Sequence, residues 1–167
     1  MRRPMVTVVP LAPSLITTSR LLLVPISGDV ALALVSGDLS AVRAGEGWPH
    51  DRTLSGLRMA LEHEHAPGWF VTLDGAVIGD CGIHGEPDGT GDVELGYGLA
   101  HPYRGRGYGA ELAIGLSRWL LDQDGVRRVV GRAALDNPPG RRTLERAGFS
   151  LESVDDEYAR YVLVRTG

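Results

Sequence analysis

The glycine-rich segment at residues 104–110, RGRGYGA, constrains the fold of this chain more than any other feature. Residues 93–99 before it read as a strand, whereas the apolar residues after it recur at helical spacing, at Tyr108, Leu112, Leu116, Trp119 and Leu120. Three alternating glycines remove side chains from the start of that helix. Such a start presents unpaired N–H groups and the positive end of the helix dipole, both of which favour phosphate oxygens. The sequence therefore predicts an anion-binding loop between a strand and a helix.

The residues predicted to form this anion site are consecutive: Arg104, Gly105, Arg106, Gly107, Tyr108, Gly109 and Ala110. A purely structural turn needs one glycine, so three spaced glycines favour a ligand site. The same letters also satisfy the dinucleotide fingerprint G-x-G-x-x-G/A, which would indicate an NAD(P)-binding oxidoreductase. That alternative is disfavoured, because residues 101–104 separate the strand from the first glycine and the preceding strands are expected to pair antiparallel.

The segments before the loop predict an antiparallel meander. Residues 69–73 and 76–78 flank Asp74-Gly75, the strongest short-range signal for a hairpin. Residues 81–84 can extend the second of these strands, and residues 93–99 form a third. Further upstream we expect a strand at residues 20–25 and helices at 28–35, capped by Ser27, and 53–64.

After the loop, the chain alternates between helices and strands. The helix that follows the loop is expected to end near Gly125. Further expected elements are a strand at 128–132, a helix from Pro138 to about Ala147, and strands at 149–154 and 158–165. This order predicts a mixed α/β (α+β) fold in a single domain spanning residues 1–167, with residues 1–15 loosely ordered.

Composition narrows the class of function. The 167 residues are 43% hydrophobic and 23% charged, which is typical of one soluble globular domain. A formal net charge of -4 argues against nucleic acid as a partner, and no apolar stretch is long enough to span a membrane. Cys81 is the single cysteine, so no internal disulfide can form, and the proline-broken start is a poor signal peptide. We therefore expect a cytoplasmic protein.

Several motifs in order resemble the GNAT N-acetyltransferase superfamily. They are residues 94–109 (ELGYGLAHPYRGRGYG), residues 136–138 (DNP) and residues 144–149 (LERAGF). The family's acyl-CoA motif, Gln/Arg-x-x-Gly-x-Gly/Ala, is met by Arg104, Gly107 and Gly109. Residues 17–23 (TTSRLLL) further resemble the branch that acetylates ribosomal-protein N-termini, the RimJ/RimL type.

The resemblance implies a GNAT fold, with a central, splayed, mostly antiparallel mixed sheet flanked by helices. It implies acetyl-CoA as co-substrate, with its pyrophosphate on the glycine loop and its pantetheine arm along a bulged strand before the loop. Alternation in that strand places Glu94, Gly96 and Gly98 on one face. Glycines in a strand often mark a bulge or the close approach of a ligand.

Chemical roles follow from the needs of amine acetylation, which are a proton acceptor, an oxyanion donor and a proton for the thiolate. Glu94 is the candidate base, and its alternative role is a salt-bridged surface glutamate. A backbone N–H at Leu99 or Ala100 is the candidate oxyanion donor. Asn137 matches the family's cofactor-contacting asparagine and can also cap the helix that begins at Pro138.

Two further residues bear on the cofactor and the proton supply. Arg141 lies where it could contact the CoA 3'-phosphate. The family commonly has serine or alanine where this chain has Gly140, so the general acid stays open, with three tyrosines or solvent as replacements: Tyr97, Tyr103 and Tyr108.

The resulting expectation is direct acetyl transfer, in a ternary complex, to a primary amine on a protein N-terminus or a small molecule. A non-catalytic acyl-CoA-binding module is the alternative. No metal is expected, since the histidines at 63 and 65 do not share a helical face. The resemblance also implies that Trp48, His50 and His84 border the acceptor pocket, because the family places such loops there. The acceptor, the acyl-chain preference and the oligomeric state stay open, although similar proteins are commonly homodimers.

Overall fold

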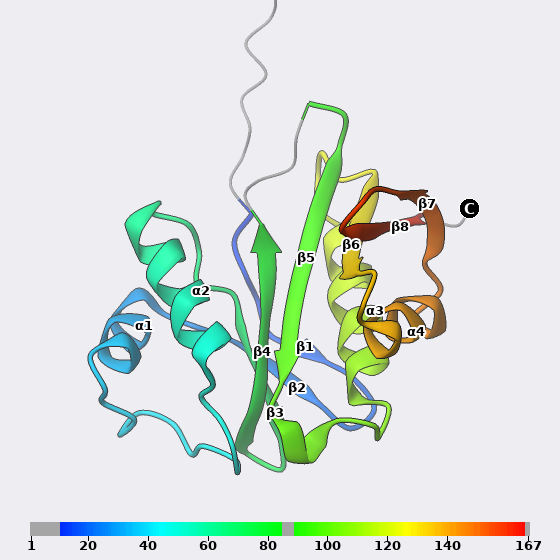
Figure 1. Ribbon diagram of the computed structural model, residues 1–167. Helices are drawn as coiled ribbons and strands as arrows, with labels where there is room; N and C mark the ends of the chain where they lie inside the picture. The colour runs from blue at the N-terminus through cyan, green and yellow to red at the C-terminus, as the bar shows by residue number, and fades with distance from the viewer. Residues whose placement is uncertain (1–10, 85–88, 166–167) are drawn as a thin grey trace, which may run out of the picture.

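The computed structural model describes residues 11–84 and 89–165 of the 167-residue chain. Within these residues, eight strands form one sheet in the order β1-β2-β3-β4-β5-β6-β8-β7 (Figure 1). Only β5 and β6 pair in parallel, and all other neighbours are antiparallel. The strands are β1 (Ile16–Thr17), β2 (Leu22–Pro25), β3 (Trp69–Leu73), β4 (Ala76–His84), β5 (Asp92–Leu99), β6 (Arg128–Ala134), β7 (Ser150–Val154) and β8 (Tyr158–Val164). The predicted mixed fold and mostly antiparallel sheet are confirmed.

Helices flank the sheet on both faces (Figure 1). They are α1 (Gly28–Val35), α2 (Asp51–Glu62), α3 (Tyr108–Leu121) and α4 (Pro138–Arg146), with a short 3-10 turn, η1 (His101–Tyr103). Ser27 caps α1 as expected, because its side chain accepts a hydrogen bond from Val30 N. The Asp74-Gly75 hairpin is also confirmed, since both residues have positive φ, as a type I′ turn requires.

Some boundaries and elements differ from the expectations. Helix α3 ends at Leu121, before Gly125, which has a positive φ in the following turn. Neither β1 nor η1 was predicted from the sequence. The loosely ordered lead was expected through residue 15, of which residues 1–10 lie outside the described chain. Ser14 contradicts that expectation, because Trp69 Nε1 donates to its carbonyl at 2.7 Å and Trp119 Nε1 to its hydroxyl at 2.8 Å.

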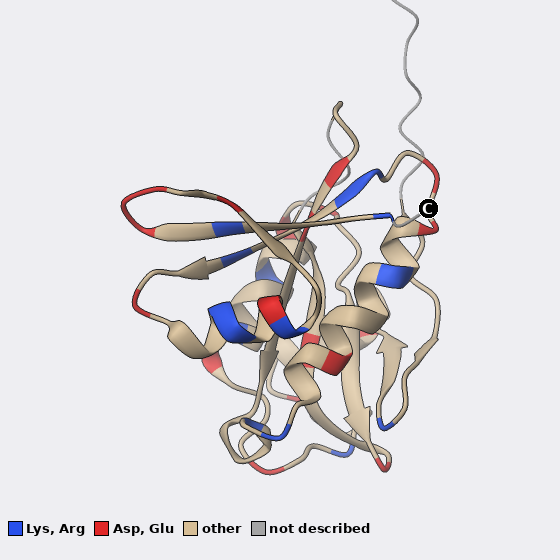
Figure 2. Cartoon of the chain, turned by 90° about the vertical axis from the view of Figure 1, so that its right-hand side faces the viewer, with Lys and Arg blue, Asp and Glu red and all other residues tan. Residues whose placement is uncertain are grey.

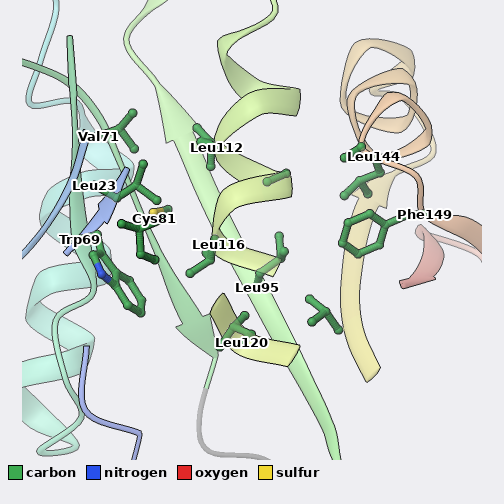
Figure 3. Packing of buried hydrophobic residues seen from close by; sticks show 14 of the residues in the cluster. Leu23, Trp69, Val71, Cys81, Leu95, Leu112, Leu116, Leu120, Leu144 and Phe149 are labelled. Carbon is green, nitrogen blue, oxygen red and sulfur yellow. The ribbon is translucent and has the colours of Figure 1, made fainter. Parts of the chain in front are cut away.

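Two buried clusters lie on the two faces of the sheet. The larger one joins α3 and α4 to the inner residues of the strands, among them Leu95, Leu112, Leu116, Leu144 and Phe149 (Figure 3). The smaller one joins α1 and α2 to the other face, and includes Leu34, Trp48, Leu57, Phe70 and Val77. The sheet is therefore held between two helical layers, and each layer buries its own apolar stripe.

The sheet splays between β5 and β6. These strands pair only from Asp92 to Glu94 with Arg128 to Val130. Asp92 anchors this short contact, because its carboxylate accepts from Arg128 Nε at 2.8 Å and Nη2 at 2.7 Å. The register between β4 and β5 runs without a shift, so the bulge expected in the strand before the loop is absent. Divergence of β5 from β6 opens the sheet instead.

No helix of the described residues is both long and apolar enough to cross a membrane.

Leu116 tests whether the α3 layer stabilises the fold. Leu116 has 0% exposure, whereas Leu32, also in a helix, is 58% exposed. Leu116→Ala should lower the free energy of unfolding by about 2–5 kcal/mol, because it leaves a cavity in the core. The matched control, Leu32→Ala, should change it by no more than about 0.5 kcal/mol. Urea denaturation measures both, and equal effects would contradict this packing.

Candidate active site

The loop that precedes α3 contains two glycines in the left-handed region. Gly105 has a φ of +75° and Gly107 one of +85°, values that other residues adopt only with strain. Gly107 is the N-cap of α3, and no side chain caps this helix. Glu111 N donates to Gly107 O, so the N–H groups of Tyr108, Gly109 and Ala110 have no acceptor within the helix. Three backbone donors are therefore directed at the space in front of α3.

Arg20, which the sequence analysis missed, holds this loop. Its Nε contacts Glu111 Oε1 at 2.7 Å, its Nη1 donates to Arg106 O at 3.2 Å, and its guanidinium lies 4.3 Å from the centre of the Tyr108 ring. Burial opposes ionisation of Glu111, but hydrogen bonds from Thr18 and Arg20 outweigh it, so the pKa of Glu111 lies below its usual value. The sequence placed Arg20 at the start of the predicted strand 20–25 and inside the motif at residues 17–23, but its partner is 91 residues away.

Two arginines of the loop, Arg104 and Arg106, lie where α3 begins. Figure 2 shows both blue and red segments in the loops at that end of the molecule, and the blue ones are all arginine, because the sequence contains no lysine. The tip of the β7–β8 hairpin is acidic instead (Figure 2). Arg104 and Arg106 thus add positive charge locally, despite the net charge of -4.

The backbone of β5 is unpaired toward β6 beyond Glu94, and we call this side of residues 95–99 the open edge. Ala100 N donates to Ile78 O at 2.8 Å, so it belongs to the β4 ladder. Because donors alternate along an antiparallel ladder, Leu99 N–H points to the open edge. Arg104 Nε donates to Leu99 O at 3.0 Å on the same side. Ala100 N–H is therefore not free to act as the oxyanion donor, and the role of Leu99 N–H stays a prediction.

Histidine side chains lie over the face of β5 that carries its glycines. A Cβ on Gly96 would lie 2.5 Å from His84 Nε2, and one on Gly98 would lie 3.3 Å from both Nε2 and Cε1 of His50. Two imidazoles thus occupy the space that side chains at these positions would need. The close approach expected from the glycines is real, but it is made by histidines of the same chain.

His50 is fixed by the start of α2. Its Nδ1 accepts from Thr53 N at 3.3 Å, so an imidazole serves as the helix N-cap. Thr53 Oγ1 in turn donates to Asp80 Oδ2 at 2.6 Å, and Trp48 Nε1 donates to the same oxygen at 3.0 Å. Within the described residues, His50 Nε2 is buried without a hydrogen-bond partner.

Glu94, the predicted base, lies at the point where β5 and β6 part. Its carboxylate forms an ion pair with Arg132 Nε, and the Arg132 guanidinium lies 5.2 Å from the centre of the Tyr158 ring. The Glu94 side chain is 20% exposed. The salt-bridged role is therefore present in the structure, and its role as a base stays a prediction.

Asn137 and Arg141 lie at the start of α4. Asn137 Oδ1 accepts from Gly140 N at 3.2 Å, which confirms its capping role. A Cβ on Gly140 would lie 2.6 Å from Asn137 Nδ2, so a serine here would require the Asn137 amide to shift. Arg141 Nε donates to Tyr161 Oη at 3.2 Å, and this hydrogen bond raises the pKa of Arg141.

The three candidate tyrosines differ in position. Tyr97 borders the cavity described below, and burial raises its pKa to about 12 against a smaller lowering by Thr143. Tyr103 packs against Gly45, and Tyr108 lies under Arg20. Burial, with a smaller contribution from the charge of Asp80, raises the pKa of the Cys81 thiol, which makes it a poor nucleophile.

A cavity of about 700 Å³ lies between α2, strands β4 to β6 and α4. It brings together Glu94, Asn137, His50 and His84 with the glycine face of β5. The predicted loop residues and Arg141 do not line it, and η1 lies between β5 and that loop. In the described part of the chain, no group of three or more metal-ligating side chains could hold an ion.

The dinucleotide alternative fails on the fold. The strand before the glycine loop pairs antiparallel with β4, and only three residues of it pair in parallel with β6. A dinucleotide-binding fold would need a parallel βαβ unit at this point.

Comparisons with known proteins agree with this architecture. Residues 20–150 match the model of the acetyltransferase (GNAT) domain. An uncharacterized N-acetyltransferase of Bacillus subtilis, YjdG, is 34% identical over 88 residues, which are 53% of this chain and 52% of that protein. The chain thus matches about half the length of this curated relative.

Solved structures share the fold. The ribosomal alpha-N-protein acetyltransferase RimL, in complex with coenzyme A, is 16% identical with a TM-score of 0.65, over 90% of this chain and 98% of that one. Mycobacterium smegmatis RimJ, in complex with a CoA-disulfide, is 19% identical with a TM-score of 0.62, over 91% and 88%. At these identities the likeness establishes the fold alone. Because the family model covers most of the chain, from Arg20 to Ser150, this protein belongs to the acetyltransferase (GNAT) domain family.

Proposed function

We propose that this protein transfers an acetyl group from acetyl-CoA directly to a primary amine in a ternary complex. The proposal rests on two neighbouring sets of backbone N–H groups that have no partner among the residues that the structure describes. The open edge of β5 leads within a few residues to the three unpaired N–H groups at the start of α3. An extended arm and a diphosphate are the two ligand parts that such donors favour, in that order.

On this proposal the pantetheine arm pairs with the open edge as an added strand, and the pyrophosphate lies on Gly105, Gly107 and the first turn of α3. Leu99 N–H then faces the thioester carbonyl. The amine enters through the part of the cavity that α2 lines, and it meets the thioester where β5 and β6 part.

Glu94 is the proposed proton acceptor, directly or through water. It borders the cavity, and its carboxylate is held by Arg132. When Glu94 takes up the proton, its ion pair with Arg132 loses its negative partner. The acceptor's ammonium group must therefore compete with Arg132 for the Glu94 carboxylate. The departing thiolate resembles an ordinary thiol, with a pKa of roughly 8.5, and can take its proton from solvent.

The proposed acceptor is a protein N-terminus or a small-molecule amine. The fold shared with RimL and RimJ supports the first class. A non-catalytic CoA-binding module is the second candidate, favoured by the lack of a serine at Gly140. Free-thiol release with a panel of N-terminal peptides and small amines separates the two. Since the chain has no lysine, its own side chains cannot supply acetylated amines to that assay.

Gly105 tests the loop. Gly105→Ala should weaken CoA binding about tenfold or more, because strain at positive φ displaces donors to a charged group. Gly125→Ala is the matched control, since Gly125 also has a positive φ and open space around its Cβ. Both variants should lose similar stability without ligand, but only Gly125→Ala should keep normal affinity by calorimetry. Equal affinities in the two would oppose the proposed loop site.

Glu94→Gln tests the base. Turnover should fall by about 100-fold or more, while acetyl-CoA affinity stays within about twofold, because only proton transfer is lost. Glu152→Gln is the control, as Glu152 is also paired with arginines but lies outside the cavity lining. Near-normal turnover in Glu94→Gln would remove the assignment.

Arg141 tests the 3'-phosphate contact. Arg141→Ala should weaken CoA about tenfold and leave dephospho-CoA unchanged, because a charge-assisted hydrogen bond is lost. Tyr161→Phe removes the hydroxyl that Arg141 Nε contacts and should have a smaller effect in the same direction. Equal losses for both cofactors would reject the contact.

A further inference from the structure

His50 presents an unused polar atom beside the proposed reaction centre. Its Nε2 is buried and has no hydrogen-bond partner among the described residues, and His50 is one of the residues that line the cavity. Buried polar groups are nearly always paired, so such an atom calls for an explanation. The helix cap does not use Nε2, because the cap bond is made by Nδ1.

The backbone fixes the tautomer of this imidazole. Thr53 N–H can only donate, and it is directed at His50 Nδ1. Nδ1 is therefore the acceptor, and the neutral ring must carry its proton on Nε2. Hence Nε2 is a hydrogen-bond donor, and it cannot act as the base that accepts a proton from the amine.

The donor is also rigidly placed. Asp80 on β4 accepts from Thr53 and Trp48, which tie the first turn of α2 and the preceding loop to the sheet. Thr53 has 2% exposure and Trp48 4%, so this support is buried. A donor fixed before the substrate binds needs no reorganisation during the reaction, which is what oxyanion stabilisation requires.

The position of His50 Nε2 places this donor beside residues 98–99 of β5. Nε2 lies over Gly98, and the next residue, Leu99, turns its N–H to the open edge. One donor thus approaches residues 98–99 from the face of the strand and another from its edge. Any side chain at position 98 would separate Nε2 from the strand, which accounts for the glycine.

We infer that His50 Nε2–H donates a hydrogen bond to the thioester carbonyl oxygen of the bound acyl-CoA and, together with Leu99 N–H, stabilises the oxyanion. This inference rests on the proposed function. The amine lone pair attacks the thioester carbon, and the C=O pair moves to oxygen, where the two donors hold the charge. When the pair returns, the C–S bond breaks, the amine's proton passes to Glu94 or water, and the thiolate takes a proton from water.

Two substitutions separate the donor from the cap. His50→Asn keeps an oxygen that can accept from Thr53 N–H, and asparagine is a preferred N-cap, but its amide is too short to replace Nε2. His50→Gln places an amide near the position of Nε2 and gives up the cap. His50→Asn should therefore fold normally and lose about 100- to 1,000-fold in kcat, whereas His50→Gln should melt at a lower temperature and retain more of its turnover.

The decisive readout needs no acceptor. Acetyl-CoA labelled with ¹³C at the carbonyl is bound to each protein, and the isotope-edited infrared C=O stretch is recorded. It should lie at lower frequency on the wild type than on His50→Asn, because the donor polarises the bond. The control His84→Asn, which removes the imidazole over Gly96, should match the wild type in this frequency.

The outcomes distinguish the two levels of the account. If calorimetry shows that wild type and His50→Asn bind acetyl-CoA alike and the C=O stretch is the same in both, the role of His50 is overturned while the proposed function stands. If the wild type does not bind acetyl-CoA at all, the proposed function is overturned and this inference with it.

Discussion

The parting of β5 from β6 is the structural event on which the rest of this molecule depends. Three residue pairs and the Asp92–Arg128 ion pair hold the strands together at one end. Beyond Glu94 the backbone donors of β5 lose their partner strand, and such donors are costly unless a ligand or water meets them. The large α3 cluster keeps the two strands apart by filling the space behind them with Leu112, Leu116 and Phe149. The proposed binding groove thus arises from sheet geometry rather than from a dedicated set of side chains.

The glycines of β5 show how one face and one edge of a strand can serve different purposes. Gly96 and Gly98 leave room for the rings of His84 and His50 on the α2 face, while the edge stays available for a ligand. Gly109 serves a third purpose, since a Cβ there would lie 3.2 Å from Thr143 and the helices α3 and α4 therefore approach closely. The three glycines belong to one sequence motif, but each is required by a different neighbour: His84, His50 and Thr143.

Local signals predicted most elements of the fold, and distant partners explain what they missed. The Asp74-Gly75 hairpin and the Ser27 cap depend on neighbouring residues, so the sequence pattern was sufficient. Arg20 acts on Glu111 across 91 positions, and His50 reaches Gly98 because Thr53 ties the start of α2 to Asp80 on β4. The commitment of Ala100 N–H to Ile78 depends on strand register, which alternation alone does not fix. Side-chain partners of this kind become visible only when the sheet is assembled.

Amide hydrogen exchange by NMR tests the central claim most directly, because it reports on the individual backbone donors. On binding coenzyme A, the amides of Tyr97, Leu99, Tyr108, Gly109 and Ala110 should become protected, while Ala100, already bonded to Ile78, should change little. Binding that leaves the exchange of Leu99 and of the first turn of α3 unaltered would contradict the account.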